Sequence, residues 1–146
     1  MGGVRIQSGA SIPNLINLCV DRSVEGEISG RIYHCYTEEP WRFENVVQLL
    51  RYLERFYDGI RFPEASVILR NFAGKERQKK PAEWKAVADK KEMMEHRGQC
   101  ATFYVYVQYR QNASWQGTLV WKEKEREVEF RSALEMIMLV DNALGE

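Results

Sequence analysis

The sequence has few metal-binding or redox side chains. Its 146 residues include only three cysteines (Cys19, Cys35 and Cys100) and two histidines (His34 and His96). A metal site needs three or four ligands at ordered spacing, and a disulfide framework uses an even set of cysteines. None of the cysteines has CxxC spacing, and the two histidines lie in different segments. We therefore expect no metal and no cofactor, and a reducing, cytoplasmic location.

The sequence also lacks an excess of charge and a long hydrophobic run. Lys plus Arg is 21 and Asp plus Glu is 21, so the formal net charge is zero. Non-specific binding to nucleic acid or to a membrane surface normally needs a basic excess. No apolar run approaches the roughly 20 residues that span a bilayer. Nucleic acid is therefore an unfavoured partner, and no membrane association is expected.

Catalytic motifs are missing as well. The sequence contains no GxSxG elbow, no Walker A motif and no GxGxxG loop. Glutamates crowd the expected turns, but no neighbouring group would shift the pKa of one of them for acid–base work. We expect that the protein is not an enzyme and has no catalytic residues.

An internal repeat is the main positive signal. Shifting the sequence by 87 residues superposes residues 14–58 on 101–145 without a gap. Apolar residues coincide, and in both copies the hydrophobic period changes from two to 3.6 at the same place. Examples of matched pairs are Ile16 with Phe103, Gly30 with Gly117, Phe43 with Phe130 and Leu53 with Val140.

Each copy has the pattern strand, strand, short strand, helix. In the first copy the strands are expected at 14–22, 27–36 and 41–43. The apolar face of a helix, Val47 included, runs from Phe43 to Tyr57, with Asp58-Gly59 as its stop. In the second copy they are expected at 101–110, 116–122 and 127–131, followed by a helix whose apolar face, Leu134 included, runs to Leu144. The predicted fold is a single α+β domain over 1–146. Two βββα units form an antiparallel sheet packed by two or three helices with pseudo-two-fold symmetry.

A connector over residues 60–99 separates the two units. Residues 62–72 fit a short helix, and Ser66–Leu69 also fits a strand. Residues 73–99 carry eight basic and five acidic side chains with few periodic apolar residues. This segment is either a solvated, partly helical connector or a basic arm for an acidic partner.

The second face of the predicted sheet is not cleanly polar. Five residues have the strand parity opposite to the core set: Cys19, Tyr33, Tyr104, Tyr106 and Val120. They predict a cover, which is either the segment at 63–72, the charged connector or a second subunit. A homodimer is therefore possible.

One turn carries an unusual cluster. Trp115 stands beside Arg110, Asn112 and Gln116, and aromatic and polar side chains of this kind are enriched at binding hot spots. The indole either contacts a partner or folds back over the sheet. We take these four residues as the candidate partner-binding site.

Two resemblances involve the same region. The pattern D/N-x-S-x-x-G occurs at Asp21–Gly26 and Asn112–Gly117 and resembles the second motif of PilZ domains, which bind cyclic di-GMP. In that family an R-x-x-x-R pair shortly upstream binds the ligand, and no such pair stands shortly before either copy here. The stretches 110–117 (R-x-N-x-S-W-Q-G) and 130–135 (F-R-S-A-L-E) resemble small bacterial proteins to which no activity is attached.

Three functions fit these observations. The first is a non-enzymatic binding or accessory module that holds a protein partner. The second is a small-ligand or nucleotide sensor with a site between the repeats. The third is single-stranded nucleic-acid binding through the face that carries Tyr33, Tyr104 and Tyr106. The sequence favours the first.

Overall fold

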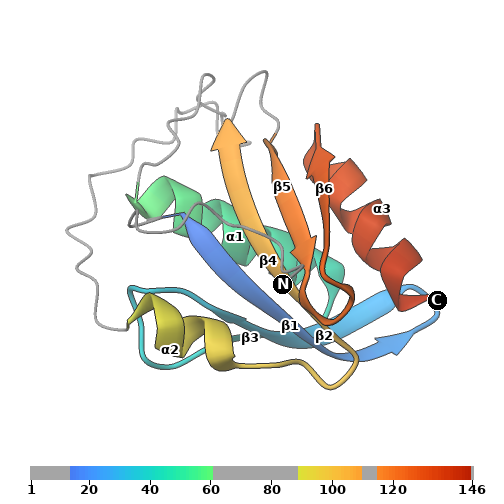
Figure 1. The fold of residues 1–146 in the computed structure, drawn as a ribbon, viewed down its shortest axis with the longest axis horizontal. Coiled ribbons are helices and arrows are strands. Elements are labelled where there is room, and N and C mark those ends of the chain that lie inside the picture. The colour runs from blue at the N-terminus through green and yellow to red at the C-terminus, as the bar shows by residue number, and fades with distance from the viewer. Residues whose placement is uncertain (1–13, 61–88, 110–114, 146) are drawn as a thin grey trace, which may run out of the picture.

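One antiparallel sheet of six strands organises the chain (Figure 1). The computed structural model describes residues 14–60, 89–109 and 115–145. Their elements are β1 (Leu15–Val24), β2 (Glu27–Tyr33), β3 (Trp41–Phe43), α1 (Val46–Ile60), α2 (Lys90–Glu95), β4 (Ala101–Tyr109), β5 (Gln116–Trp121), the 3₁₀ turn η1 (Lys122–Lys124), β6 (Arg126–Phe130) and α3 (Ala133–Leu144). The predicted α+β class is confirmed. The expected helix or strand within 62–72 lies outside the described residues.

Several element boundaries differ from the sequence prediction by one to three residues, and two of these differences have a clear physical reason. The strand expected to reach residue 36 ends at Tyr33, because the chain turns where the Tyr36 N–H donates to Nδ1 of buried His34 at 3.1 Å. Helix α1 runs past Asp58 to Ile60, beyond its expected stop. Phe56 and Tyr57 are fully buried in its last turns, and packing of an apolar face outweighs the weak helix preference of a glycine.

The strand order is β3-β2-β1-β4-β5-β6, so the two halves of the chain meet where β1 pairs with β4. Asn17 lies directly opposite Tyr104 in this central pair. The registers recur at the 87-residue spacing: Leu18 pairs with Ile32 as Val105 pairs with Leu119. Both β1 and β4 also have a bulge at the same place, between Val20 and Arg22 and between Val107 and Tyr109.

The main core lies between α1, α3 and one face of the sheet. Alternate residues of β1 and β4 point into it, as strand geometry requires, and α1 and α3 cover them. Its largest fully buried side chains are Phe43, Phe56, Tyr57, Phe103 and Phe130. Val47 and Leu134, which the sequence placed on the apolar faces of the two helices, are instead exposed. Each follows the buried side of its helix by one position. One position turns a side chain by about 100° around the helix axis, so both side chains point away from the core.

Two glycines let neighbouring strands approach each other closely. A Cβ on Gly117 would overlap the backbone carbonyl of Tyr106, and a Cβ on Gly30 would overlap that of Cys19. Phe130 lies opposite Gly117, and Phe43 lies opposite Gly30. In each half a glycine therefore pairs with the large aromatic residue of the edge strand.

We predict that Gly117→Ala destabilises the protein by about 2 kcal/mol or more, because backbone atoms rather than a flexible side chain must move. Urea unfolding measures the change. Gly145→Ala is the matched control, since a Cβ there makes only ordinary contacts of 3.6 Å. Equal free energies of unfolding for the Gly117 variant and the unchanged chain would contradict the packing described here.

Candidate functional site

The second face of the sheet carries a row of side chains across four strands. Tyr33, Asn17, Tyr104 and Val120 lie side by side on β2, β1, β4 and β5. Cys19 and Leu15 complete this surface, which we call the second face. Asn17 is its polar centre and is 0% exposed. A buried amide costs free energy unless it is hydrogen-bonded, so something must bond it.

Helix α2 covers this face. Its Met93 side chain is buried against the second face, and Met94 packs beside it. The cover that the sequence predicted is therefore, in the described residues, the charged connector. Within its described part, residues 90–95 form α2, and Met93 packs on the sheet, so this part is not wholly solvated.

Polar side chains of the sheet hold α2 by its backbone. Asn17 Nδ2 donates to the carbonyls of Met93 and His96, both at 2.9 Å. The Tyr104 hydroxyl donates to Met94 O at 3.0 Å, and Lys122 Nζ donates to the same oxygen at 2.6 Å. These donors satisfy carbonyls that a helix leaves open at its C-terminal end.

The fourth side chain that donates to this segment is Arg31, and an ion pair holds it in place. Arg31 donates from Nε and Nη2 to the Asp21 carboxylate, at 2.9 and 3.0 Å. Its Nη2 also donates to Arg97 O, and its Nη1 donates to the Tyr33 hydroxyl. Burial alone would raise the pKa of Asp21, but hydrogen bonds from Arg31 and the Gln99 N–H outweigh it and lower the pKa. We call Asn17, Arg31, Tyr104 and Lys122 the carbonyl-binding row.

Burial shifts three titratable groups on this face toward their neutral forms. It raises the pKa values of the Cys19 thiol and the Tyr104 hydroxyl to about 12, and it lowers the pKa of Lys122. Cys19 is therefore a thiol rather than a reactive thiolate at neutral pH.

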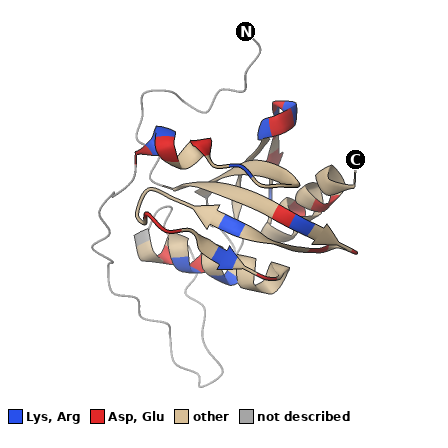
Figure 2. Cartoon of the chain, turned by 90° about the horizontal axis from the view of Figure 1, so that it is seen from below, with Lys and Arg blue, Asp and Glu red and all other residues tan. Residues whose placement is uncertain are grey.

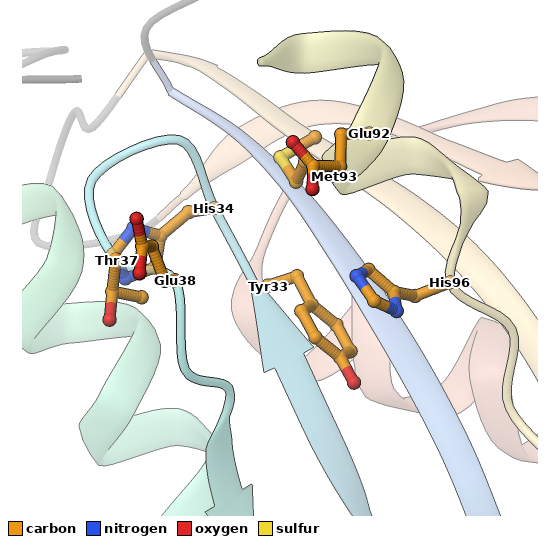
Figure 3. Close-up of a pocket in the computed structure, with 7 residues that line it drawn as sticks. All are labelled: Tyr33, His34, Thr37, Glu38, Glu92, Met93 and His96. Carbon is orange, nitrogen blue, oxygen red and sulfur yellow. The ribbon is translucent and has the colours of Figure 1, made fainter. Parts of the chain in front are cut away.

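A cavity of about 310 Å³ opens between α2 and the loop after β2 (Figure 3). In Figure 3, Tyr33 and His96 stack face to face, with ring centroids 3.8 Å apart, across from His34, Thr37 and Glu38. Burial lowers the pKa of His34 to about 4, so its ring is neutral at pH 7. The formal charges on the walls are those of Glu38 and Glu92, both exposed.

A second hollow, of about 460 Å³, lies between the two halves of the chain. The turn of the β1–β2 hairpin forms one wall, and the last turn of α3 forms the other. Its polar groups come from Ser23, Glu25, Asp141 and Asn142. It is an open, polar groove.

Trp115, the centre of the site predicted from the sequence, lies in the core. Its side chain is 7% exposed, and its indole N–H donates to a Glu54 carboxylate oxygen at 3.1 Å. The ring packs edge-on against Tyr57, with centroids 6.0 Å apart. The indole thus folds back over the sheet, which is the packing alternative of the sequence analysis.

The rest of that predicted cluster is only partly described. Gln116 is half-buried at the start of β5, next to Trp115. Arg110 and Asn112 lie outside the described residues. A partner contact through these four residues stays a prediction.

Helix α3 exposes two large apolar side chains. Leu134 is 69% exposed and Met138 is 57% exposed, one turn apart, and Val128 of the edge strand β6 is also exposed. Small exposed apolar residues are common singly, but a group of large ones marks an interaction surface. The sequence analysis missed this surface and the carbonyl-binding row. An available signal was that α3 is apolar around nearly its whole circumference.

The described residues can be searched for a metal site, for a membrane-spanning helix and for a surface on which bases could stack. Among residues 14–60, 89–109 and 115–145, no group of three or more His, Cys, Asp or Glu could hold a metal ion. No helix in this part of the chain is long and apolar enough to cross a membrane. Tyr33 and Tyr104 are buried under α2, so a base could stack on them only if α2 moved away.

Comparison with known proteins gives no match: no family model, curated protein or solved structure is significantly similar to this chain.

We predict that Trp115→Ala lowers the free energy of unfolding by about 3 kcal/mol or more, through lost packing and the lost bond to Glu54. Trp115→Phe keeps an aromatic ring in the core but removes the indole N–H, and it should lose clearly less. Chemical unfolding followed by circular dichroism measures both. A free energy unchanged in Trp115→Ala would show that the indole does not stabilise the core.

We also predict a pH dependence from His34. Its pKa is 6.5 in the unfolded chain and about 4 in the folded protein, so the unfolded state binds more protons between these values. Stability should fall as the pH drops from 6.5 toward 4, by up to about 3 kcal/mol.

The variant His34→Asn tests this assignment, because the Asn oxygen can still accept from the Tyr36 N–H. Its free energy of unfolding should change less with pH over that window than the unchanged chain's. The same substitution at exposed His96 is the control. Loss of the pH dependence in the His96 variant alone would contradict the assignment to His34.

Proposed function

We propose that this protein is a non-enzymatic binding module of the cytoplasm that docks a protein partner on α3. The observation that carries the proposal is the exposed pair Leu134 and Met138 on α3, and Val128 of the neighbouring strand β6 is exposed as well. Burying large apolar side chains of this kind is the main favourable term in protein association.

The first half of the chain supports this interpretation by contrast. Helix α1 occupies the place in its half that α3 occupies in the other, and Arg51 stands where α3 has Met138. Arg51 is exposed, which is ordinary for a helix position that faces water. The methionine at the matched position of α3 needs another explanation, and a docked partner supplies one.

Charge indicates the chemistry of the partner. Helix α3 contains no Lys or Arg, and its charged residues are Glu135 and Asp141 (Figure 2). The C-terminal end of a helix also carries partial negative charge. An amphipathic helix with an apolar stripe beside lysines or arginines would complement both features. A second copy of this chain would bring an α3 that has no basic residue.

We further infer that the two halves arose by duplication and are related by an approximate two-fold axis between β1 and β4. Three kinds of observation support this inference: the matched strand registers, the matched bulges and the matched glycine–phenylalanine pairs. In this interpretation the apolar surface of α3 arose after the copies diverged.

The small-ligand sensor stays an alternative, because the groove beside α3 lies between the two halves as that hypothesis requires. Its open, polar walls favour it less than the apolar surface of α3 favours a protein partner. A ligand bound there would raise the melting temperature of the protein, and the stabilisation would grow with the logarithm of one plus its concentration over its Kd.

The docking surface can be tested with a short amphipathic helical peptide of leucine and lysine as the probe. We expect Leu134→Asp and Met138→Asp each to weaken its binding by about tenfold or more, because each puts a charge into the buried contact. Fluorescence anisotropy of the labelled peptide measures the Kd. A peptide with the same composition in scrambled order reports the purely electrostatic part.

Val47→Asp is the matched control, since Val47 holds the same position on α1 and is 61% exposed. It should leave the Kd unchanged. Equal binding by all variants, or preference for the scrambled peptide, would contradict docking on α3. Light scattering on the unchanged chain tests the other occupant: a dimer that Leu134→Asp converts to monomer would identify a second copy as the partner.

A further inference from the structure

The carbonyl-binding row recognises backbone rather than sequence. Its donors reach the carbonyls of Met93, Met94, His96 and Arg97. Any polypeptide presents such carbonyls at the end of a helix, because the last turn leaves them unbonded. The side chain of α2 that this face buries most fully is Met93.

The same surface suits an exchangeable contact. A permanent core contact would gain more from apolar residues than from a buried amide and three further polar donors. Arg31 and Lys122 are only partly buried even with α2 in place, so water can hydrate their donors when the helix leaves. The polar row therefore lowers the cost of uncovering the face.

Helix α2 itself is short and weakly formed. It has six residues, and its N-cap residue Asp89 makes no side-chain capping bond. Lys91, Glu92 and Glu95 point to solvent and are exposed. A helix of this length has little stability of its own, so it depends on its contacts with the sheet.

From these observations we propose that the second face is a peptide-binding surface. In the free protein α2 occupies this surface and can be displaced from it. The partner that replaces α2 is a short helix of another protein, with a methionine-like side chain that becomes buried and with unbonded carbonyls at its C-terminal end. This surface lies on the opposite side of the sheet from α3, so it is distinct from the docking surface proposed above.

The structure contains a reporter for displacement of α2. Cys19 is fully buried in the cluster that Met93 closes. In a chain with Cys35→Ala and Cys100→Ala, a thiol reagent can label Cys19 only when this cluster opens. The rate of labelling and its dependence on urea distinguish local opening from global unfolding.

The first measurement compares three such full-length chains. We expect Cys19 to be labelled faster than global unfolding allows, with little dependence on urea. Met93→Asp should raise the rate by about tenfold or more, because the anchor of α2 is lost. Lys91→Asp, the same substitution at an exposed position of α2, should leave the rate unchanged. Labelling that follows global unfolding would show that α2 is a fixed part of the core and overturn the proposal.

The second measurement adds a ligand. The probe is a synthetic peptide of residues 89–97 with blocked ends, and a control peptide has Asp in place of Met93. The first peptide should slow Cys19 labelling in the Met93→Asp chain by about tenfold at saturation, and the control peptide should not. If Met93→Asp does not fold, Met93→Ala removes the anchor without adding charge and gives the same comparison.

Two results of this second step would overturn the proposal. Equal protection by both peptides would show that binding to the second face does not depend on the methionine side chain of the peptide. Protection by a single-stranded oligonucleotide but not by the peptide would instead assign the uncovered tyrosines to nucleic-acid stacking. Because Leu134→Asp leaves the second face intact, it should not alter Cys19 labelling, so failure of the α3 proposal is distinguishable from failure of this one.

Discussion

The pairing of β1 with β4 is the contact on which the rest of the structure depends. These strands come from opposite halves of the chain, with the whole connector between them. Bringing them together costs chain entropy, and the loss is offset by the apolar residues that both strands bury against α1 and α3. The same pairing places Asn17 beside Tyr104, so it also assembles the second face. One strand pair therefore builds the core and the site on which α2 lies.

The two faces of the sheet are covered in different ways. On the core side, two amphipathic helices cover alternating apolar residues, and the contact is permanent. On the second face a six-residue helix covers a mixed surface, held by side-chain bonds to its carbonyls. Hydrophobic packing favours one fixed arrangement, whereas bonds to backbone carbonyls can be exchanged for water or for another chain. This difference is why we assign exchangeable binding to the second face and stability to the core. The binding assigned to the outside of α3 rests instead on its exposed apolar side chains.

Periodicity in the sequence predicted the strands and the two long helices, because alternation and 3.6-residue spacing follow from burial on one side. Strand parity also predicted that something covers Cys19, Tyr33 and Tyr104. It could not identify α2, since a short segment held through its carbonyls leaves no side-chain pattern. Trp115 was ambiguous for the same kind of reason: its contacts, Glu54 and Tyr57, lie far away in the sequence. The exposure of Leu134 depended on the exact rotation of α3, which a helix with so few polar residues does not reveal.

Native-state hydrogen exchange at residue resolution tests the central claim most directly, which is that the two halves form one cooperative unit on which α2 is a separate, exchangeable element. The account predicts that amides of β1 and β4 are the most protected and exchange with the free energy and urea dependence of global unfolding. Amides of α2, such as that of Met93, should exchange through a smaller opening that depends little on urea. Exchange of α2 with the same free energy as β1 and β4 would contradict the account.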